Sequence, residues 1–125
     1  MKDAAWHRWR YLAAPRPFQI IGAWSGRRLA GAAAFRCQAG SAIVAEVQTC
    51  EVDAARALLK EACRLARAQD AWRVALLIQA GTPLEQAALA TGFVPRPRGF
   101  PVVAADLAGG LPRAALFQGG DFDVI

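Results

Sequence analysis

The chain has 125 residues, of which 55% are hydrophobic and 20% charged, and its formal net charge at pH 7 is +5. This composition is typical of one globular domain with one core and excludes a disordered chain. No apolar run approaches the roughly 20 residues of a membrane-spanning helix, and the N-terminus lacks the apolar stretch of a signal peptide, so we expect a soluble, cytoplasmic protein. The positive charge favours an anionic ligand or serves solubility, and its dispersion along the chain argues against a nucleic-acid partner.

An aromatic and basic segment opens the chain and ends at two prolines. Trp6, Trp9 and Arg10 stand at helical spacing within it. Aromatic residues alternating with arginine can stack on nucleic acid or dip into a membrane surface, but one short stretch more often packs on the edge of a domain. We therefore predict a single domain over residues 1–125, with residues 1–17 packed on its core.

Three strands are predicted next, over residues 18–24, 28–37 and 42–48. Turn signals at Gly26 and Gly40 separate them. Such short connections join neighbouring antiparallel strands, so the three should form a meander.

A strand-helix-strand unit follows. Residues 52–69 carry apolar side chains at helical spacing, with charged side chains mostly on the other face, which predicts a helix packed on a sheet. Residues 72–79 form a nearly continuous apolar run, which indicates a central strand buried on both faces. A strand, a helix and a strand in this order imply a right-handed crossover, so strands 42–48 and 72–79 should be parallel.

A second, short helix has clear start and stop signals. Thr82 can cap it, Pro83 suits its first turn, and Glu85 stands three residues after Thr82 as in a capping box. Gly92 ends it.

The three cysteines, Cys37, Cys50 and Cys63, are odd in number, widely spaced and outside any CxxC motif. A disulfide framework or a zinc site is therefore not expected, and we predict no metal site. Cys63 is interpreted as a core residue beside the apolar face of its helix. Cys50 lies at the strand-to-helix junction, and it is the one cysteine whose reactivity calls for a test.

Two further strands, over residues 100–106 and 113–118, complete the order β-β-β-α-β-α-β-β, an α/β (α+β) mixed sheet whose central strands are flanked by two helices. This arrangement resembles the core of the GNAT acyltransferase superfamily. The resemblance rests on the strand-helix unit 44–67, on residues 87–93 (Ala-Ala-Leu-Ala-Thr-Gly-Phe), which are similar to the "aL…GF" end of the superfamily's fourth helix, and on residues 9–11 (Trp-Arg-Tyr) together with residues 120–123 (Gly-Asp-Phe-Asp). The last pair resembles features of a bacterial subgroup whose members are often linked to surface polysaccharides.

The resemblance implies an N-acyltransferase that binds acetyl-CoA, or another acyl-CoA, between the third and fourth core strands and passes the acyl group to an amine acceptor. Its donor would lie at the strand-to-helix junction, where free backbone N–H groups can hold a phosphate. The cofactor-binding residues that the resemblance implies are Val47, Thr49, Cys50, Asp53, Ala54 and Ala55.

Glu46 is the candidate catalytic base, because it is a lone acid in an otherwise apolar strand and an amine must lose a proton before it attacks a thioester. A structural salt bridge to an arginine is the competing interpretation. The tyrosine that the superfamily often places four residues before the glycine of its fourth helix is Ala88 here. The only tyrosine, Tyr11, is distant in sequence.

Two features depart from the superfamily. Its phosphate-binding pattern, Arg/Gln-x-x-Gly-x-Gly/Ala, falls on Cys50, Asp53 and Ala55, of which only Ala55 agrees, and Asp53 adds negative charge where a pyrophosphate would lie. Members also usually carry a further strand and two helices that grip the acceptor, and this chain begins near the end of that segment. The alternative is therefore a degenerate, non-catalytic GNAT-like module that binds a protein partner or a metabolite.

The missing helices would leave apolar surface exposed, which predicts a homodimer or a partner chain.

Two charged pairs near the end of the sequence also invite interpretation. Asp121 and Asp123 are spaced like a cation-binding pair, and Arg96 and Arg98 are candidates for contact with an acidic ligand, but solvated side chains are the simpler interpretation of both pairs.

Overall fold

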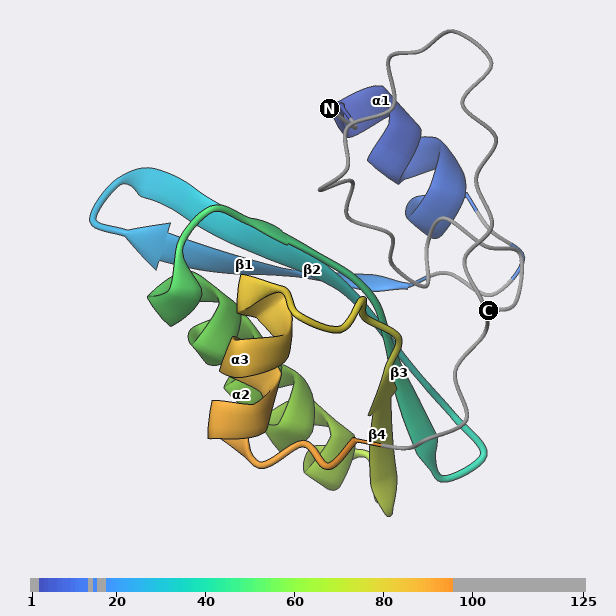
Figure 1. Cartoon of the computed structure of the whole chain (residues 1–125). Helices are drawn as coiled ribbons and strands as arrows, with labels where there is room; N and C mark the ends of the chain where they lie inside the picture. Colours follow the sequence, from blue (N-terminus) through green and yellow to red (C-terminus); the bar gives the residue numbers. More distant parts are fainter. Residues whose placement is uncertain (1–2, 14, 16–17, 96–125) are drawn as a thin grey trace, which may run out of the picture.

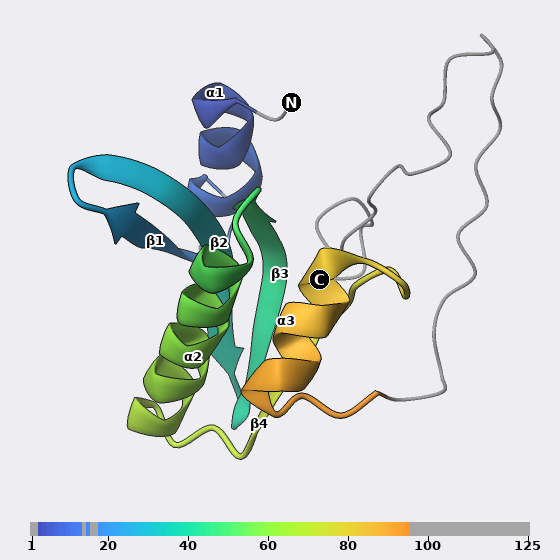
Figure 2. The same ribbon diagram turned by 60° about the vertical axis from the view of Figure 1, so that its left-hand side comes forward.

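The structure is a computed structural model, and it describes residues 3–13, 15 and 18–95 (Figures 1 and 2). The described elements, in chain order, are α1 (Ala4–His7), the π-helical turn η1 (Arg8–Leu12), β1 (Gln19–Ser25), β2 (Arg28–Gln38), β3 (Ser41–Thr49), α2 (Val52–Ala68), β4 (Arg73–Leu76) and α3 (Pro83–Thr91). The predicted strands over residues 100–106 and 113–118 lie outside the described residues, as do Arg96, Arg98, Asp121 and Asp123.

The sheet is mixed and follows the order β1-β2-β3-β4. β1 pairs with β2, and β2 with β3, in antiparallel fashion, whereas β3 and β4 are parallel. The meander and the parallel pair across α2 are therefore confirmed, and the fold is of the mixed α+β class.

Both longer helices cover one face of the sheet, and the N-terminal helical segment lies against the other (Figures 1 and 2). The main core joins α2 and α3 to the sheet through residues such as Phe35, Val44 and Leu59. A smaller cluster on the opposite face joins Tyr11 and Phe18 to strand residues. The sheet thus separates two apolar layers, and a side chain on β3 faces one layer or the other.

A bulge in β3 changes this alternation. Ala34 of β2 pairs with Glu46, whereas Phe35 pairs with Val44, so Ala45 is an extra residue in β3. Val44 and Val47 pack in the main core, while Ala45 joins the smaller cluster and Glu46 contacts Tyr11 of that cluster. The bulge therefore turns Ala45 and Glu46 toward the same side, the side of the N-terminal segment.

The prediction of a long, fully buried strand over residues 72–79 was wrong within the described residues. β4 covers only Arg73–Leu76, lies at one edge of the four described strands, and alternates between exposed and half-buried positions. Trp72 is 73% exposed, because its ring lies beside Gly40 and under the guanidinium of Arg73 and not within the sheet.

The N-terminal aromatics pack as predicted only in part. Trp6 packs on the smaller cluster, but Trp9 is 68% exposed, so the two do not share a buried face. Within the described segments, no helix is long and apolar enough to cross a membrane.

Candidate functional site

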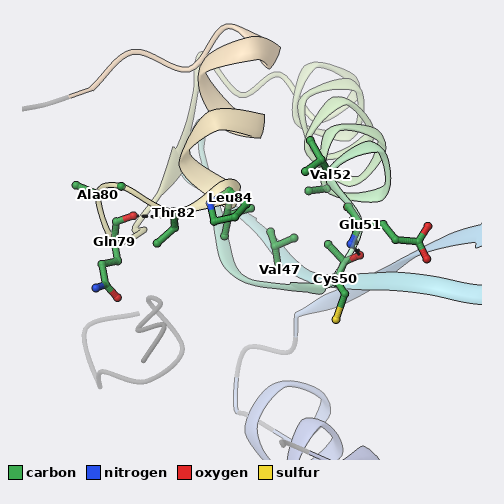
Figure 3. A pocket seen from close by; sticks show the side chains of 12 residues that line it. Val47, Cys50, Glu51, Val52, Gln79, Ala80, Thr82 and Leu84 are labelled. Atoms are coloured by element: carbon green, nitrogen blue, oxygen red, sulfur yellow. Dashed lines mark hydrogen bonds between the residues drawn. The ribbon is translucent and has the colours of Figure 1, made fainter. Parts of the chain in front are cut away.

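A cavity of about 460 Å³ lies where β3 and β4 separate (Figure 3). The pairing of these strands ends at Val44 and Leu76, after which β3 continues to α2 and the chain beyond β4 turns toward α3. One wall comes from the end of β3 and the start of α2, the other from the loop before α3 and its first turn. The lining residues are Val47, Thr49, Cys50, Glu51, Val52 and Ala55, and opposite them Gln79, Ala80, Gly81, Thr82, Pro83 and Leu84.

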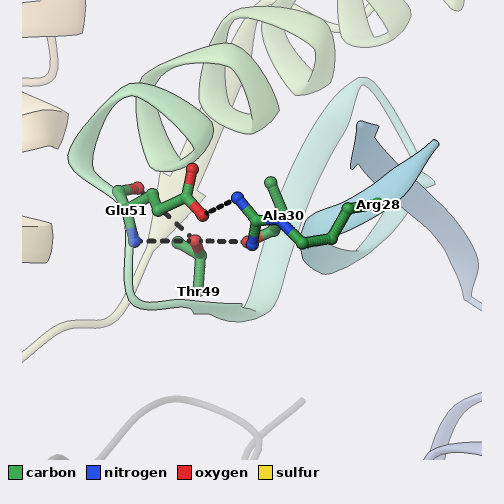
Figure 4. Close-up of polar contacts among 4 residues, drawn as sticks. All are labelled: Arg28, Ala30, Thr49 and Glu51. Carbon is green, nitrogen blue, oxygen red and sulfur yellow. Dashed lines mark hydrogen bonds and ion pairs between the residues drawn. The ribbon is translucent and has the colours of Figure 1, made fainter. Parts of the chain in front are cut away.

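The junction between β3 and α2 is held by a fixed set of hydrogen bonds (Figure 4). The Thr49 hydroxyl donates to the carbonyl of Ala30 at 2.7 Å and accepts from the backbone N–H of Glu51 at 3.0 Å. Ala30 pairs with no residue of β1, because a bulge leaves it out of the register between β1 and β2. Thr49 therefore fixes the point at which α2 begins.

Gly31 allows this close approach. A Cβ atom at Gly31 would lie 2.7 Å from the Cβ of Thr49 and 3.0 Å from the carbonyl oxygen of Gln48. Such distances are too short for a side chain, so β2 meets the end of β3 only with a glycine there.

The charge at the start of α2 is partly neutralised. Glu51 occupies the N-cap position but makes no side-chain capping bond, and its carboxylate pairs instead with the guanidinium of Arg28 at 2.5 Å (Figure 4). The first intrahelical bond runs from the N–H of Ala55 to the carbonyl of Glu51. The amides of residues 52–54 are thus the N-terminal donors of α2, and such donors attract anions.

The start of α3 completes the second wall. Thr82 accepts from the N–H of Glu85 at 3.3 Å, and the Glu85 carboxylate accepts from the N–H of Gly81 at 2.6 Å. Gly92 ends the helix in the left-handed conformation, with φ of 102°. The predicted cap, first-turn proline and stop signal are all confirmed, and they bring a second helix start to the cavity.

The structure brings four of the six predicted donor-site residues to the cavity, namely Val47, Thr49, Cys50 and Ala55. Ala54 is buried in the core and is absent from the lining. The Asp53 side chain is 97% exposed, lies outside the lining and is 3.9 Å from Arg56. The carboxylate that the resemblance put beside a pyrophosphate is therefore solvated and outside the cavity lining.

Sequence reasoning missed the second wall and Arg28. A signal for the wall was available, because the helix start at Thr82 was recognised and consecutive parallel strands place their following helix starts at one edge of a sheet. No comparable signal identified Arg28, whose contact with Glu51 depends on how far the β1–β2 hairpin reaches.

Glu46 lies on the face opposite the cavity and is only 3% exposed. The hydroxyl of Tyr11 donates to its Oε2 atom at 2.7 Å. A second contact, 2.9 Å between His7 Nε2 and Gln48 Oε1, also joins the N-terminal segment to β3. The structure thus brings the only tyrosine to the predicted base, across 35 positions of sequence.

The cysteines occupy distinct environments. Cys50 is exposed and lines the cavity, whereas Cys37 and Cys63 are half-buried. Burial raises the pKa of the Cys37 thiol and of the Cys63 thiol, and nearby Arg67 partly offsets the effect at Cys63. In the part of the chain that the structure describes, no three His, Cys, Asp or Glu side chains are grouped so that they could hold a metal ion.

Comparisons with known proteins establish the fold alone. No protein-family model matches the sequence, and no curated protein matches it significantly. Two crystal structures of TTHA1254 from Thermus thermophilus are similar, the wild type with a TM-score of 0.60 and 23% identity, and a point mutant with a TM-score of 0.61 and 22% identity. The matches cover 83% and 84% of this chain and 95% of the Thermus chain, so the two proteins share a fold over most of their lengths.

Proposed function

We propose that the chain is a GNAT-like N-acyltransferase that binds an acyl-CoA, such as acetyl-CoA, between β3 and β4 and transfers the acyl group to an amine. The observation that carries the proposal is the cavity at the point where these parallel strands part, beside the N-terminus of α2. Its volume, about 460 Å³, is within the usual range of small-molecule sites.

The cavity walls suit the neutral pantetheine arm of the donor. Most of the described lining is apolar or uncharged, and its single charged side chain, Glu51, is paired with Arg28. The N-terminal amides of α2 are the groups that would bind phosphate. Because the Asp53 carboxylate is solvated and outside the lining, the repulsion expected from it is screened.

Glu46 is the proposed base. It removes a proton from the acceptor's ammonium group, and the neutral nitrogen then attacks the thioester carbon. The new bond joins nitrogen to the acyl carbon, the carbon–sulfur bond breaks, and the CoA thiolate leaves and takes up the second proton that the nitrogen loses. Glu46 directly precedes Val47, which lines the cavity, and both residues lie beyond Val44, where the pairing of β3 with β4 ends. In this proposal the acyl end of the donor passes between the separated strands to the side of the sheet on which Glu46 lies.

A non-catalytic module that binds a metabolite or a protein partner is the second candidate. The observation that favours it is the burial of Glu46, a residue that is 3% exposed and whose carboxylate accepts a hydrogen bond from Tyr11. An acceptor reaches this carboxylate only if the covering groups make room for it.

The two candidates differ in turnover. We would measure CoA release from acetyl-CoA with a panel of small amines, for the natural protein and for Glu46→Gln. If the protein is a transferase, the natural protein should turn over acetyl-CoA, and kcat should fall about 10²–10⁴-fold in Glu46→Gln. The two proteins should bind acetyl-CoA with equal affinity. Acetyl-CoA binding without turnover for any acceptor would favour the module.

A further inference from the structure

The hydroxyl of Tyr11 and the carboxylate of Glu46 meet in a region that excludes water. Their residues are 1% and 3% exposed, and the oxygen–oxygen distance is 2.7 Å. A phenol that donates to an ionised carboxylate makes one of the stronger hydrogen bonds in proteins. Removing one partner in such a place leaves the other without that bond and without water to replace it.

Three rings fix the position of the Tyr11 side chain. Trp6 and Phe18 meet it edge-on, with ring centroids 5.6 Å and 5.1 Å away, and His7 stacks on it at 5.9 Å. The backbone N–H of Phe18 also donates to the carbonyl of Tyr11 at 2.9 Å. The hydroxyl therefore has little freedom to follow a moving carboxylate.

The bulge in β3 places the carboxylate beside this fixed hydroxyl. In a regular strand, Glu46 would face the same side as Val44, which is in the main core under α2 and α3. The extra residue, Ala45, turns Glu46 to the opposite face. An irregularity of β3 and an aromatic cluster from the N-terminal segment thus converge on a single contact.

We infer that Tyr11 is a positioning residue, which holds the Glu46 carboxylate in the orientation that accepts the amine proton. This inference rests on the proposed acyltransferase function. Tyr11 acts through Glu46 and does not itself contact the acceptor. The N-terminal segment is then part of the catalytic unit and not only a cover on the sheet.

The test compares Tyr11→Phe, Glu46→Gln and the double variant in the full chain. Tyr11→Phe keeps the ring and removes only the hydroxyl, so we expect kcat to fall on the order of 10- to 100-fold, with the KM for the acceptor and the acetyl-CoA affinity within about twofold of the natural values. If Tyr11 acts through Glu46, the double variant has the same kcat as Glu46→Gln alone. Trp9→Ala is the matched control, because it alters the same N-terminal segment at a side chain that is 68% exposed and outside the cluster, and its kcat should stay near the natural value.

Two results would overturn the inference while the proposed function stands: an active natural protein whose Tyr11→Phe variant is equally active, or single-variant losses that multiply in the double variant. If Tyr11→Phe does not fold, Glu46→Asp shortens the carboxylate with Tyr11 in place, and a comparable loss of kcat is expected. An unchanged kcat in Glu46→Asp would contradict the positioning role. A natural protein that neither binds nor turns over acetyl-CoA would reject the proposed function, and the inference falls with it.

Discussion

Arg28 and Glu51 set the charge at the edge of the cavity. Glu51 is the only charged side chain in the described lining, and Arg28 reaches it from the β1–β2 hairpin (Figure 4). The pair is partly exposed, with side-chain exposures of 65% and 41%, so it contributes little to folding stability. Its effect should appear instead in the binding of an anionic ligand.

Arg28→Ala tests this effect. If acetyl-CoA is the donor, as we propose, the Glu51 carboxylate without the guanidinium repels its phosphates by about 1 kcal/mol, which corresponds to about fivefold weaker acetyl-CoA binding. Glu51→Gln should change the affinity in the opposite direction. Both are measured by calorimetric titration.

The matched control is Arg64→Ala. It breaks a pair with Glu61 of nearly the same exposure, 65% and 38%, farther along α2 and away from the cavity. We expect no change in affinity there. Equal losses in the two arginine variants would show that the effect is general and not one of the cavity edge.

At the scale of the elements, the junction between β3 and α2 depends on an approach between strands that only glycine permits. The bond from Thr49 to Ala30 fixes where α2 begins, and Gly31 lets the two strands come together. The junction is therefore set by packing between strands as well as by the local sequence.

Gly31→Ala should destabilise the protein by about 1–3 kcal/mol, because the added methyl group overlaps Thr49 and forces the strands apart. Gly22→Ala is the control within the same pair of strands, since its nearest neighbours are the side chains of Trp24 and Leu29, which are exposed and can shift. Urea denaturation measures both. A Gly31→Ala variant no less stable than Gly22→Ala would contradict this view of the junction.

Local sequence signals predicted most helices and strands, whereas the contacts at the candidate site depend on the register between distant segments. Short stretches of sequence were enough to predict the cap at Thr82, the stop at Gly92 and the apolar face of α2. The β3 bulge and the contact between Tyr11 and Glu46 depend on how distant segments align, so no local sequence pattern predicts them. Trp72 was misassigned because an apolar run does not show which of its residues enter the sheet.

At the scale of the whole molecule, exposed apolar side chains gather on β1 and β2. Trp24 and Leu29 are paired across the two strands, and Ile20 lies farther along β1, with exposures of 66%, 50% and 43%. β1 contains no charged residue or proline, and these are common means of blocking pairing at a sheet edge. The homodimer expected from the sequence remains a prediction, and β1 is the edge we would test.

Light scattering at micromolar concentration should find a dimer, and Trp24→Lys should shift it to a monomer. Trp72→Lys replaces a similarly exposed tryptophan at the opposite edge of the described sheet and should leave the dimer intact. A natural protein that is a clean monomer would contradict the prediction.

The central claim is that the cavity between β3 and β4 is an acyl-CoA site, and calorimetric titration of acetyl-CoA tests it most directly. The natural protein should bind. Ala80→Trp should not, because Ala80 is an exposed residue of the lining where a large side chain fills the cavity without entering the core. Absence of binding by the natural protein, or equal binding by Ala80→Trp, would contradict the claim.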